Sequence, residues 1–171
     1  MRYIFENVNS NYDEQKGINT LKYTKWMSSI LRRSEEIGKV ELPICSIILD
    51  ERGRCIGRGV NRRNINNDPL GHAEIMSLTQ ASLKKNDWRF NECIIITNLE
   101  PCTMCASELI QARMGKVIFG AYDEKRGGLG GSIDLSKHES AHHKMEIIGG
   151  ILEDECSEIL QIWFKKLRTQ K

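Results

Sequence analysis

The segments GHAEIM, residues 71–76, and LEPCTMC, residues 99–105, decide how this chain of 171 residues folds. The second segment follows an apolar run, CIIIT at residues 93–97, which is typical of a short buried strand. Helical spacing of apolar residues predicts helices over about 70–84 and about 102–113. Each of the two segments therefore lies where a helix is expected to begin.

The rest of the chain, read outward from these segments, alternates strands and helices. A helix is expected from Thr20 to Gly38, and residues 1–19 are expected to form a polar, flexible extension of a single domain, 20–171. The element order α-β-β-α-β-α-β-β-α favours an α/β fold with helices packed on a mixed sheet. A glycine cluster at 127–131 suits tight turns, the close approach of another backbone segment, or a plain flexible loop. The remaining strands are expected over 44–49, 55–62, 116–122 and 145–148, and a last helix over 152–168.

The composition is that of an ordinary globular protein, with 40% hydrophobic and 28% charged residues. A net charge of +2 neither requires nor excludes a nucleic-acid partner. The first residues lack the basic start and apolar core of a secretory signal, and no apolar run reaches the ~20 residues that a membrane helix needs. We therefore expect a cytoplasmic protein with no membrane association, whose six cysteines stay reduced.

His72, Cys102 and Cys105 form a candidate zinc site. The two cysteines are three residues apart, so one helical turn places both sulfurs on the same face. The N-terminal end of a helix favours negative charge and makes thiolate ligands more available. Zinc prefers thiolate and imidazole ligands in a tetrahedron, and three protein ligands leave one position for water. This arrangement is typical of a catalytic zinc rather than a structural one.

Glu74 is the candidate catalytic residue because a carboxylate beside an activated water can accept and pass on its proton. Residues two apart on a regular helix diverge by about 200°. His72 and Glu74 can therefore converge only if they lie at the very start of the helix. The Asp68-Pro69 pair just upstream supports a helix that begins there.

Taken singly, each motif has a plainer interpretation. A lone histidine is usually structural, and a lone C-x-x-C is compatible with a redox pair or with half of a structural zinc knuckle. A redox pair needs no His-x-Glu partner, and a second knuckle would need another close pair of cysteines. The joint pattern favours a catalytic zinc.

The chain resembles the bacterial tRNA-specific adenosine deaminases of the cytidine and deoxycytidylate deaminase superfamily. The pattern H-x-E followed by P-C-x-x-C is the signature of zinc deaminases that act on nucleobases. The resemblance extends from about Leu42 to Arg168. Its matching positions are Asn61-Arg62, Asp68-Pro69, 72–76, 99–102, 104–106, Arg113, 117–121, Asp123, Lys125, 150–152 and 154–156.

The resemblance implies a three-layer α-β-α sandwich around a five-stranded mixed sheet. It also implies a homodimer, one zinc ion per subunit, and hydrolysis of adenosine to inosine at the wobble position in the anticodon stem-loop of a tRNA. His72, Cys102 and Cys105 would bind the zinc and Glu74 would move protons. Asn61 would hydrogen-bond the flipped base. The other substrate contacts implied are Asp123, Lys125 and His143.

Some positions depart from the family pattern, and other functions stay open. Ser107-Glu108, Tyr122 and His142 stand where other residues are common, which concerns the substrate contacts and not the metal. A deaminase of free guanine or cytosine bases or nucleosides shares the metal motif. A pyrimidine deaminase of riboflavin synthesis spaces its cysteines more widely. A zinc-bearing RNA-binding subunit without catalysis could do without Glu74. The candidate phosphate-binding residues are Arg62, Arg63, Lys125, Arg126, Lys165, Lys166, Arg168 and Lys171.

Overall fold

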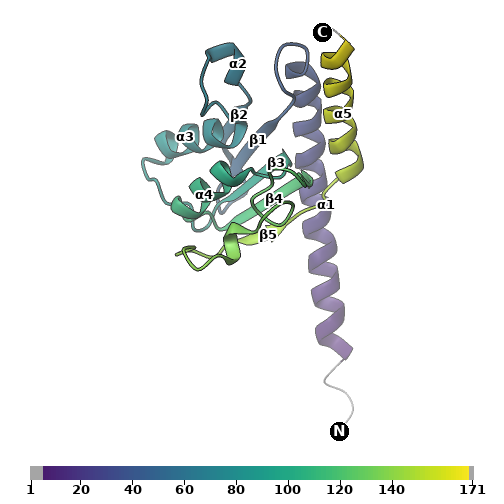
Figure 1. Cartoon of the computed structure of the whole chain (residues 1–171). Helices are drawn as coiled ribbons and strands as arrows, with labels where there is room; N and C mark the ends of the chain where they lie inside the picture. The colour runs from purple at the N-terminus through teal and green to yellow at the C-terminus, as the bar shows by residue number, and fades with distance from the viewer. Residues whose placement is uncertain (1–5, 170–171) are drawn as a thin grey trace.

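A five-stranded mixed sheet forms the middle of the molecule, with strand order β2-β1-β3-β4-β5 (Figure 1). The structure, a computed structural model, describes residues 6–169, and side chains from residue 21 onward. β1 pairs antiparallel with β2 and β3, whereas β3, β4 and β5 run parallel to one another. The strands are β1 Cys45–Leu49, β2 Cys55–Val60, β3 Ile94–Leu99, β4 Lys116–Ala121 and β5 Glu146–Ile148.

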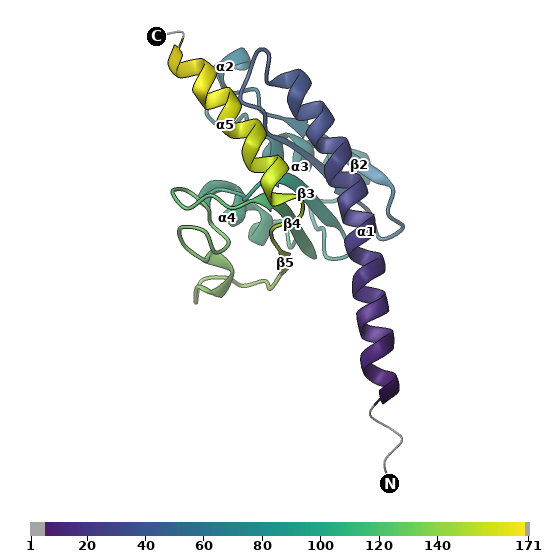
Figure 2. The same ribbon diagram turned by 90° about the vertical axis from the view of Figure 1, so that its right-hand side faces the viewer.

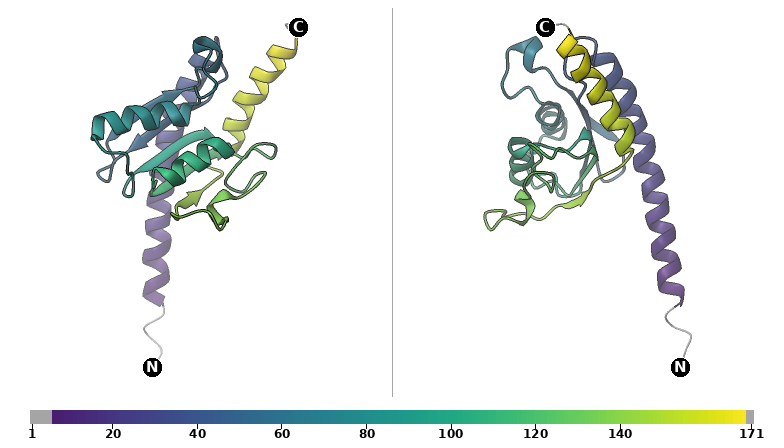
Figure 3. Two further views of the ribbon diagram at one scale, coloured as in Figure 1. Left: turned by 60° about the vertical axis from the view of Figure 1, so that its left-hand side comes forward. Right: turned by 45° about the vertical axis from the view of Figure 1, so that its right-hand side comes forward.

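Helices cover both faces of this sheet and complete a three-layer sandwich. α1, Glu6–Ile37, and α5, Glu153–Thr169, lie side by side on one face (Figure 2). α3, Ala73–Lys85, and α4, Thr103–Gln111, lie on the opposite face (Figure 3). Two shorter elements are α2, Arg63–Asn66, and the 3₁₀ turn η1, Leu135–Lys137. The expected fold class, three-layer α/β with a five-stranded mixed sheet, is confirmed.

Apolar side chains fill the space between the sheet and each helical layer. Ile47 of β1 packs in the cluster beneath α1 and α5, while the next residue, Ile48, packs in the cluster beneath α3 and α4. This alternation explains why the strands read as continuous apolar runs, since a strand covered on both faces needs apolar residues at every position. β1 is buried at all of its positions.

The predicted bounds of the strands agree with the structure more closely than the predicted starts of the helices do. α1 begins at Glu6 and not at Thr20, so residues 6–19 of the predicted polar, flexible extension are helical, and residues 1–5 lie outside the described part. Residues 6–19 contain no proline, but they include four asparagines and a glycine, and a mostly polar helix gives little apolar period by which to recognise it. α2 and η1 are too short to show an apolar period, so the sequence does not predict them. No helix among the described residues is long and apolar enough to cross a membrane.

Candidate metal centre and active site

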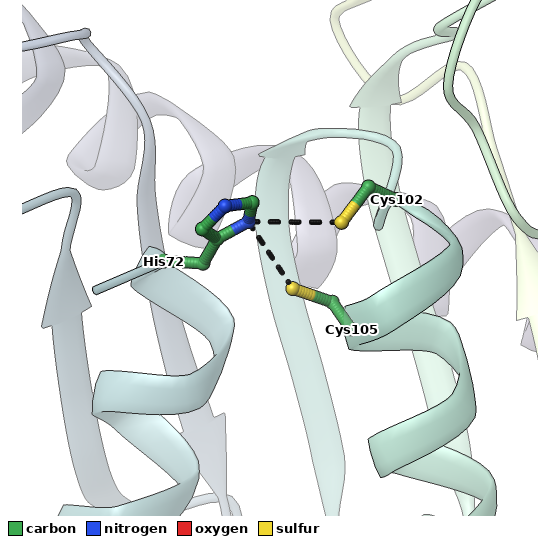
Figure 4. A group of neighbouring side chains, drawn as sticks. All are labelled: His72, Cys102 and Cys105. Atoms are coloured by element: carbon green, nitrogen blue, oxygen red, sulfur yellow. Dashed lines mark hydrogen bonds between the residues drawn. The ribbon is translucent and has the colours of Figure 1, made fainter. Parts of the chain in front are cut away.

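The N-terminal ends of α3 and α4 bring the three predicted metal ligands together (Figure 4). His72 is the N-cap residue of α3 and Cys102 is the N-cap residue of α4, and both have extended backbone conformations. Cys105 lies in the first turn of α4 and is fully buried. The Nδ1 atom of His72 lies 3.6 Å from the Sγ atom of Cys102 and 3.5 Å from that of Cys105.

These separations suit a tetrahedral zinc ion. Ordinary zinc–sulfur and zinc–nitrogen bond lengths with tetrahedral angles place the nitrogen and each sulfur about 3.6 Å apart. The three donor atoms all lie within 4.8 Å of one another. Imidazole and thiolate are the donors that zinc prefers. The predicted ligands therefore fit the ion without any rearrangement of the helices that carry them.

The two sulfurs differ in acidity because they share a hydrogen bond. The bond from Cys105, supported by His72, lowers the pKa of Cys102 to about 4, although burial acts in the opposite direction. The same bond, together with burial, raises the pKa of Cys105. The pair thus behaves as one thiolate and one thiol that share a proton, a pair whose proton a divalent cation can replace.

Direct packing of α3 on the sheet fixes the position of its first turn. A Cβ atom on Gly59 of β2 would lie 1.8 Å from the carbonyl oxygen of Ala73. The hydroxyl of Ser46 on β1 donates to that same carbonyl oxygen at 2.7 Å. Within the helix, Ser77 donates to the carbonyl oxygen of Glu74 at 2.9 Å. Close approach and a buried hydrogen bond therefore hold the segment that carries His72 and Glu74.

Glu74 is a buried carboxylate beside the metal ligands. Its side chain is 4% exposed, and its Oε2 atom has no hydrogen-bond partner in the described part of the chain. Burial raises the pKa of Glu74 to about 7, and the nearby charge of Cys102 adds to this shift. In a regular helix, residues two apart point in different directions. Because His72 precedes α3 with an extended backbone and Glu74 lies in the first turn, both side chains can face the same site. A buried carboxylate with one oxygen free of hydrogen bonds suits proton transfer.

The structure places the four predicted substrate contacts in different surroundings. Asn61 is buried, and its Oδ1 atom accepts a hydrogen bond from the backbone N–H of Arg63 at 3.1 Å. Asp123 accepts hydrogen bonds from the backbone N–H groups of Lys125 and Arg126, each at 3.0 Å, so it shapes a turn that exposes Lys125. The Nε2 atom of His143 lies 2.9 Å from the carbonyl oxygen of Met114. The substrate roles of these residues stay predictions.

Glu100 is a buried carboxylate for which the sequence indicated no role. Its oxygens accept hydrogen bonds from the backbone N–H groups of Asp123 at 3.0 Å, Leu129 at 2.9 Å and Gly131 at 2.9 Å. Glu100 lies two residues before the metal ligand Cys102. Its hydrogen bonds therefore hold the Asp123–Gly131 loop next to the metal centre.

The glycine cluster is the sequence signal that could have revealed this contact. A Cβ atom on Gly127 or on Gly131 would lie 2.3 or 2.2 Å from the Oε2 atom of Glu100. Of the three interpretations that the sequence left open, the structure supports the close approach of another group, which here is a carboxylate. The loop is therefore closely packed and not a plain connection.

Fold and site together define a zinc-dependent hydrolytic deaminase. A model of the cytidine and deoxycytidylate deaminase zinc-binding region matches residues 20–121. The chain belongs to this cytidine and deoxycytidylate deaminase family. The resemblance that the two motifs indicated is thereby confirmed.

Relatives that match most of the chain share one name. The tRNA-specific adenosine deaminase of Haemophilus influenzae is 30% identical over 164 residues, which cover 96% of this chain and 90% of that protein. The protein of the same name from Bacillus subtilis is 34% identical over 149 residues, 87% of this chain and 91% of its own length. A solved structure from studies of A-to-I editing by tRNA:A34 deaminases at the wobble position is 32% identical. It covers 80% of this chain and 99% of its own, with a TM-score of 0.76.

Proposed function

We propose that this deaminase hydrolyses adenosine to inosine at the wobble position of a tRNA anticodon. The observation that carries the chemistry is the buried carboxylate of Glu74, whose Oε2 atom has no hydrogen-bond partner, beside the His72, Cys102 and Cys105 donors. The substrate class follows from relatives, named tRNA-specific adenosine deaminases, that match the chain over most of its length.

Glu74 carries the proton in this reaction. His72, Cys102 and Cys105 would hold the zinc ion, which would supply Lewis-acid activation and lower the pKa of a water molecule toward ~7. Glu74 accepts a proton from that water and delivers it to N1 of the adenine ring while the water oxygen bonds to C6. Glu74 then accepts the remaining proton from the hydroxyl group on C6 and passes it to the amino group, and the C6–N bond breaks as the C6 carbonyl forms. Water is consumed and ammonia is released, so adenosine becomes inosine without any redox step.

A single-stranded loop suits this buried site. A base must leave its stack to reach Glu74, and extraction costs least where the base is unpaired. Arg62, Arg63, Lys125 and Arg126 are exposed and provide positive charge for the flanking phosphates. Because the net charge is only +2, we expect modest and salt-sensitive binding.

We further propose that the protein works as a homodimer in the cytoplasm. All six cysteines are free, which suits a reducing compartment. Dimerisation rests on the family resemblance alone. Sedimentation velocity should give about twice the mass of one chain, 19.6 kDa, at micromolar concentration. A monomer that forms inosine at full rate would contradict the dimer without affecting the chemistry.

A substrate panel tests the proposed activity. We expect the purified protein to form inosine in an anticodon stem-loop with adenosine at the wobble position, measured by nucleoside analysis after digestion. Free adenosine, guanine and cytidine should remain unchanged under the same conditions. Deamination of a free base together with an unmodified stem-loop would instead establish the alternative, a deaminase of free nucleobases. Zinc binding without deamination of any substrate would indicate the RNA-binding subunit.

A further inference from the structure

Glu41 is a buried carboxylate that lies outside the metal centre. It follows the end of α1, and its backbone N–H donates to the carbonyl oxygen of Ile37 at 2.9 Å. Only 1% of its surface is exposed. Burying a carboxylate is costly unless hydrogen bonds compensate, so its partners indicate what it does.

Those partners lie in and beside α2. The Oε2 atom of Glu41 accepts from the backbone N–H groups of Asn64 at 2.8 Å and Ile65 at 3.1 Å. Its Oε1 atom accepts from the Asn64 side-chain amide at 2.7 Å and from the N–H of Leu42 at 3.0 Å. Burial alone raises the pKa of Glu41, but these hydrogen bonds outweigh it and leave the pKa below its ordinary value. The carboxylate is therefore ionised at neutral pH.

Glu41 thus caps a helix that begins far along the chain. The N-cap residue of α2, Arg62, makes no capping hydrogen bond through its side chain. Unpaired N–H groups at a helix start need an acceptor, and a negative charge there is favourable. α2 has four residues and buries none of them, so apolar packing does not hold it. A helix of this length has little stability of its own. Besides the hydrogen bonds from the N–H of Arg62 to the carbonyl oxygen of Gly71 at 2.8 Å and from the N–H of Arg63 to Asn61, its attachment rests on Glu41.

The same short helix holds Asn61 in place. The N–H of Arg63, the first residue of α2, donates to the Oδ1 atom of Asn61 at 3.1 Å. The backbone N–H of Asn61 donates to the carbonyl oxygen of Ile44 at 2.9 Å. With Oδ1 engaged, the Nδ2 end of the amide is the end left for a substrate. Where that end points depends on where α2 lies.

We infer that Glu41 is a positioning residue for the substrate: its carboxylate holds α2, and α2 orients the Asn61 side chain toward the base. This inference rests on the proposed function, because it assigns the positioned group to binding of the flipped adenine. Both carboxylate oxygens of Glu41 are engaged by Leu42, Asn64 and Ile65, none of which is a metal ligand. Its loss should therefore impair recognition of the substrate and leave the zinc in place.

The first experiment replaces Glu41 and its partner in α2. In Glu41→Gln an NH₂ group must face two N–H donors whichever way the amide turns. Asn64→Asp places a second carboxylate against Glu41 at an exposed position, so that this variant folds even if the first does not. Asn66→Asp is the matched control, with the same charge change on the same helix but no contact with Glu41. Hydrogen exchange of the Ile65 amide reports on the attachment of α2, and zinc content and stem-loop kinetics are measured in parallel.

We expect faster exchange at Ile65 in Glu41→Gln and Asn64→Asp, with zinc content unchanged. The kcat/KM for the stem-loop should fall roughly tenfold or more. Asn66→Asp should stay within about twofold of the unmodified chain. Unchanged exchange in both test variants, or loss of zinc from either, would overturn the positioning role.

A double variant separates positioning from a general loss of structure. If Glu41 acts through Asn61, Asn61→Ala already removes what Glu41 positions. The kcat/KM of Glu41→Gln/Asn61→Ala for the stem-loop should then equal that of Asn61→Ala within about twofold. If kcat/KM of the double variant instead falls by the product of the two single-variant reductions, the inference is overturned. An unmodified chain that leaves the stem-loop unchanged would refute the proposed function, and the Ile65 exchange measurement would still decide whether Glu41 holds α2.

Discussion

The donors of His72 and Cys102 meet because each of these residues comes directly before its helix begins. At an N-cap the backbone is extended, so the side chain is directed past the helix end and not along its side. The spacing of the motifs allowed these ligands to be predicted, since it requires only two helix starts. It could not reveal Glu41 or Glu100. Their partners, Asn64 and Leu129, lie 23 and 29 residues away, and no local pattern connects a carboxylate to N–H groups at such separations.

At the residue scale, metal retention should depend on Cys102 and not on cysteines in general. Cys102→Ser replaces a thiolate by a hydroxyl that does not ionise near neutral pH, so we expect loss of most bound zinc and of activity. Cys55→Ser is the control, because Cys55 is only half-buried and lies outside the donor cluster. Metal analysis after dialysis measures both variants. Stoichiometric zinc in Cys102→Ser would contradict the assigned ligand set.

At the element scale, the active site depends on how closely α3 packs on β2. Gly57 and Gly59 have no Cβ, and one added at either position would collide with the backbone of α3. The sequence showed the strand over 55–62 but not the reason for its glycines, because that reason lies in a helix that follows a loop. Similarly, α2 has no apolar face, and only its partner in the fold explains why it is ordered.

Gly59→Ala should displace the first turn of α3. The added methyl group would lie 1.8 Å from the carbonyl oxygen of Ala73. We expect a cost on the order of 3 kcal/mol in the free energy of unfolding, together with weaker zinc binding as His72 moves. Arg58→Ala is the control, because Arg58 is exposed on the same strand. Denaturant unfolding and zinc titration measure both effects. A Gly59→Ala protein with unchanged stability would show that α3 does not need this close contact.

At the scale of the whole molecule, one face of the sheet is structural and the other carries the chemistry. α1 and α5 cover one face and α3 and α4 the other (Figure 3), and the metal centre lies at the starts of α3 and α4 (Figure 4). The alternation of elements predicted helices packed on a mixed sheet, and the family resemblance implied the three layers and five strands. The length of α1 could not be predicted, because Val8, Tyr12 and Ile18 are the only apolar residues among residues 6–19.

Binding of the stem-loop should depend on salt in proportion to the phosphates contacted. Each contact contributes about −0.7 to the slope of log affinity against log salt for a single strand. If Lys125 and Arg126 each neutralise one phosphate, Lys125→Ala/Arg126→Ala should reduce the slope by about 1.4. Arg52→Ala, in the turn between β1 and β2, should leave it unchanged. Fluorescence anisotropy at several salt concentrations gives these slopes. A double variant with the unmodified slope would exclude phosphate contacts from the Asp123–Gly131 loop.

The most direct test of the account is a comparison of the unmodified chain with Glu74→Gln, in which zinc content and inosine formation in the anticodon stem-loop are measured on the same samples. We predict about one zinc per chain in both proteins and a turnover that falls by roughly 10²–10⁴-fold in the variant, because the proton carrier is gone while the three ligands remain. Glu92→Gln, a change at an exposed carboxylate outside the metal centre, should behave like the unmodified chain. Undiminished inosine formation by Glu74→Gln, or an unmodified chain that binds no zinc, would contradict the account.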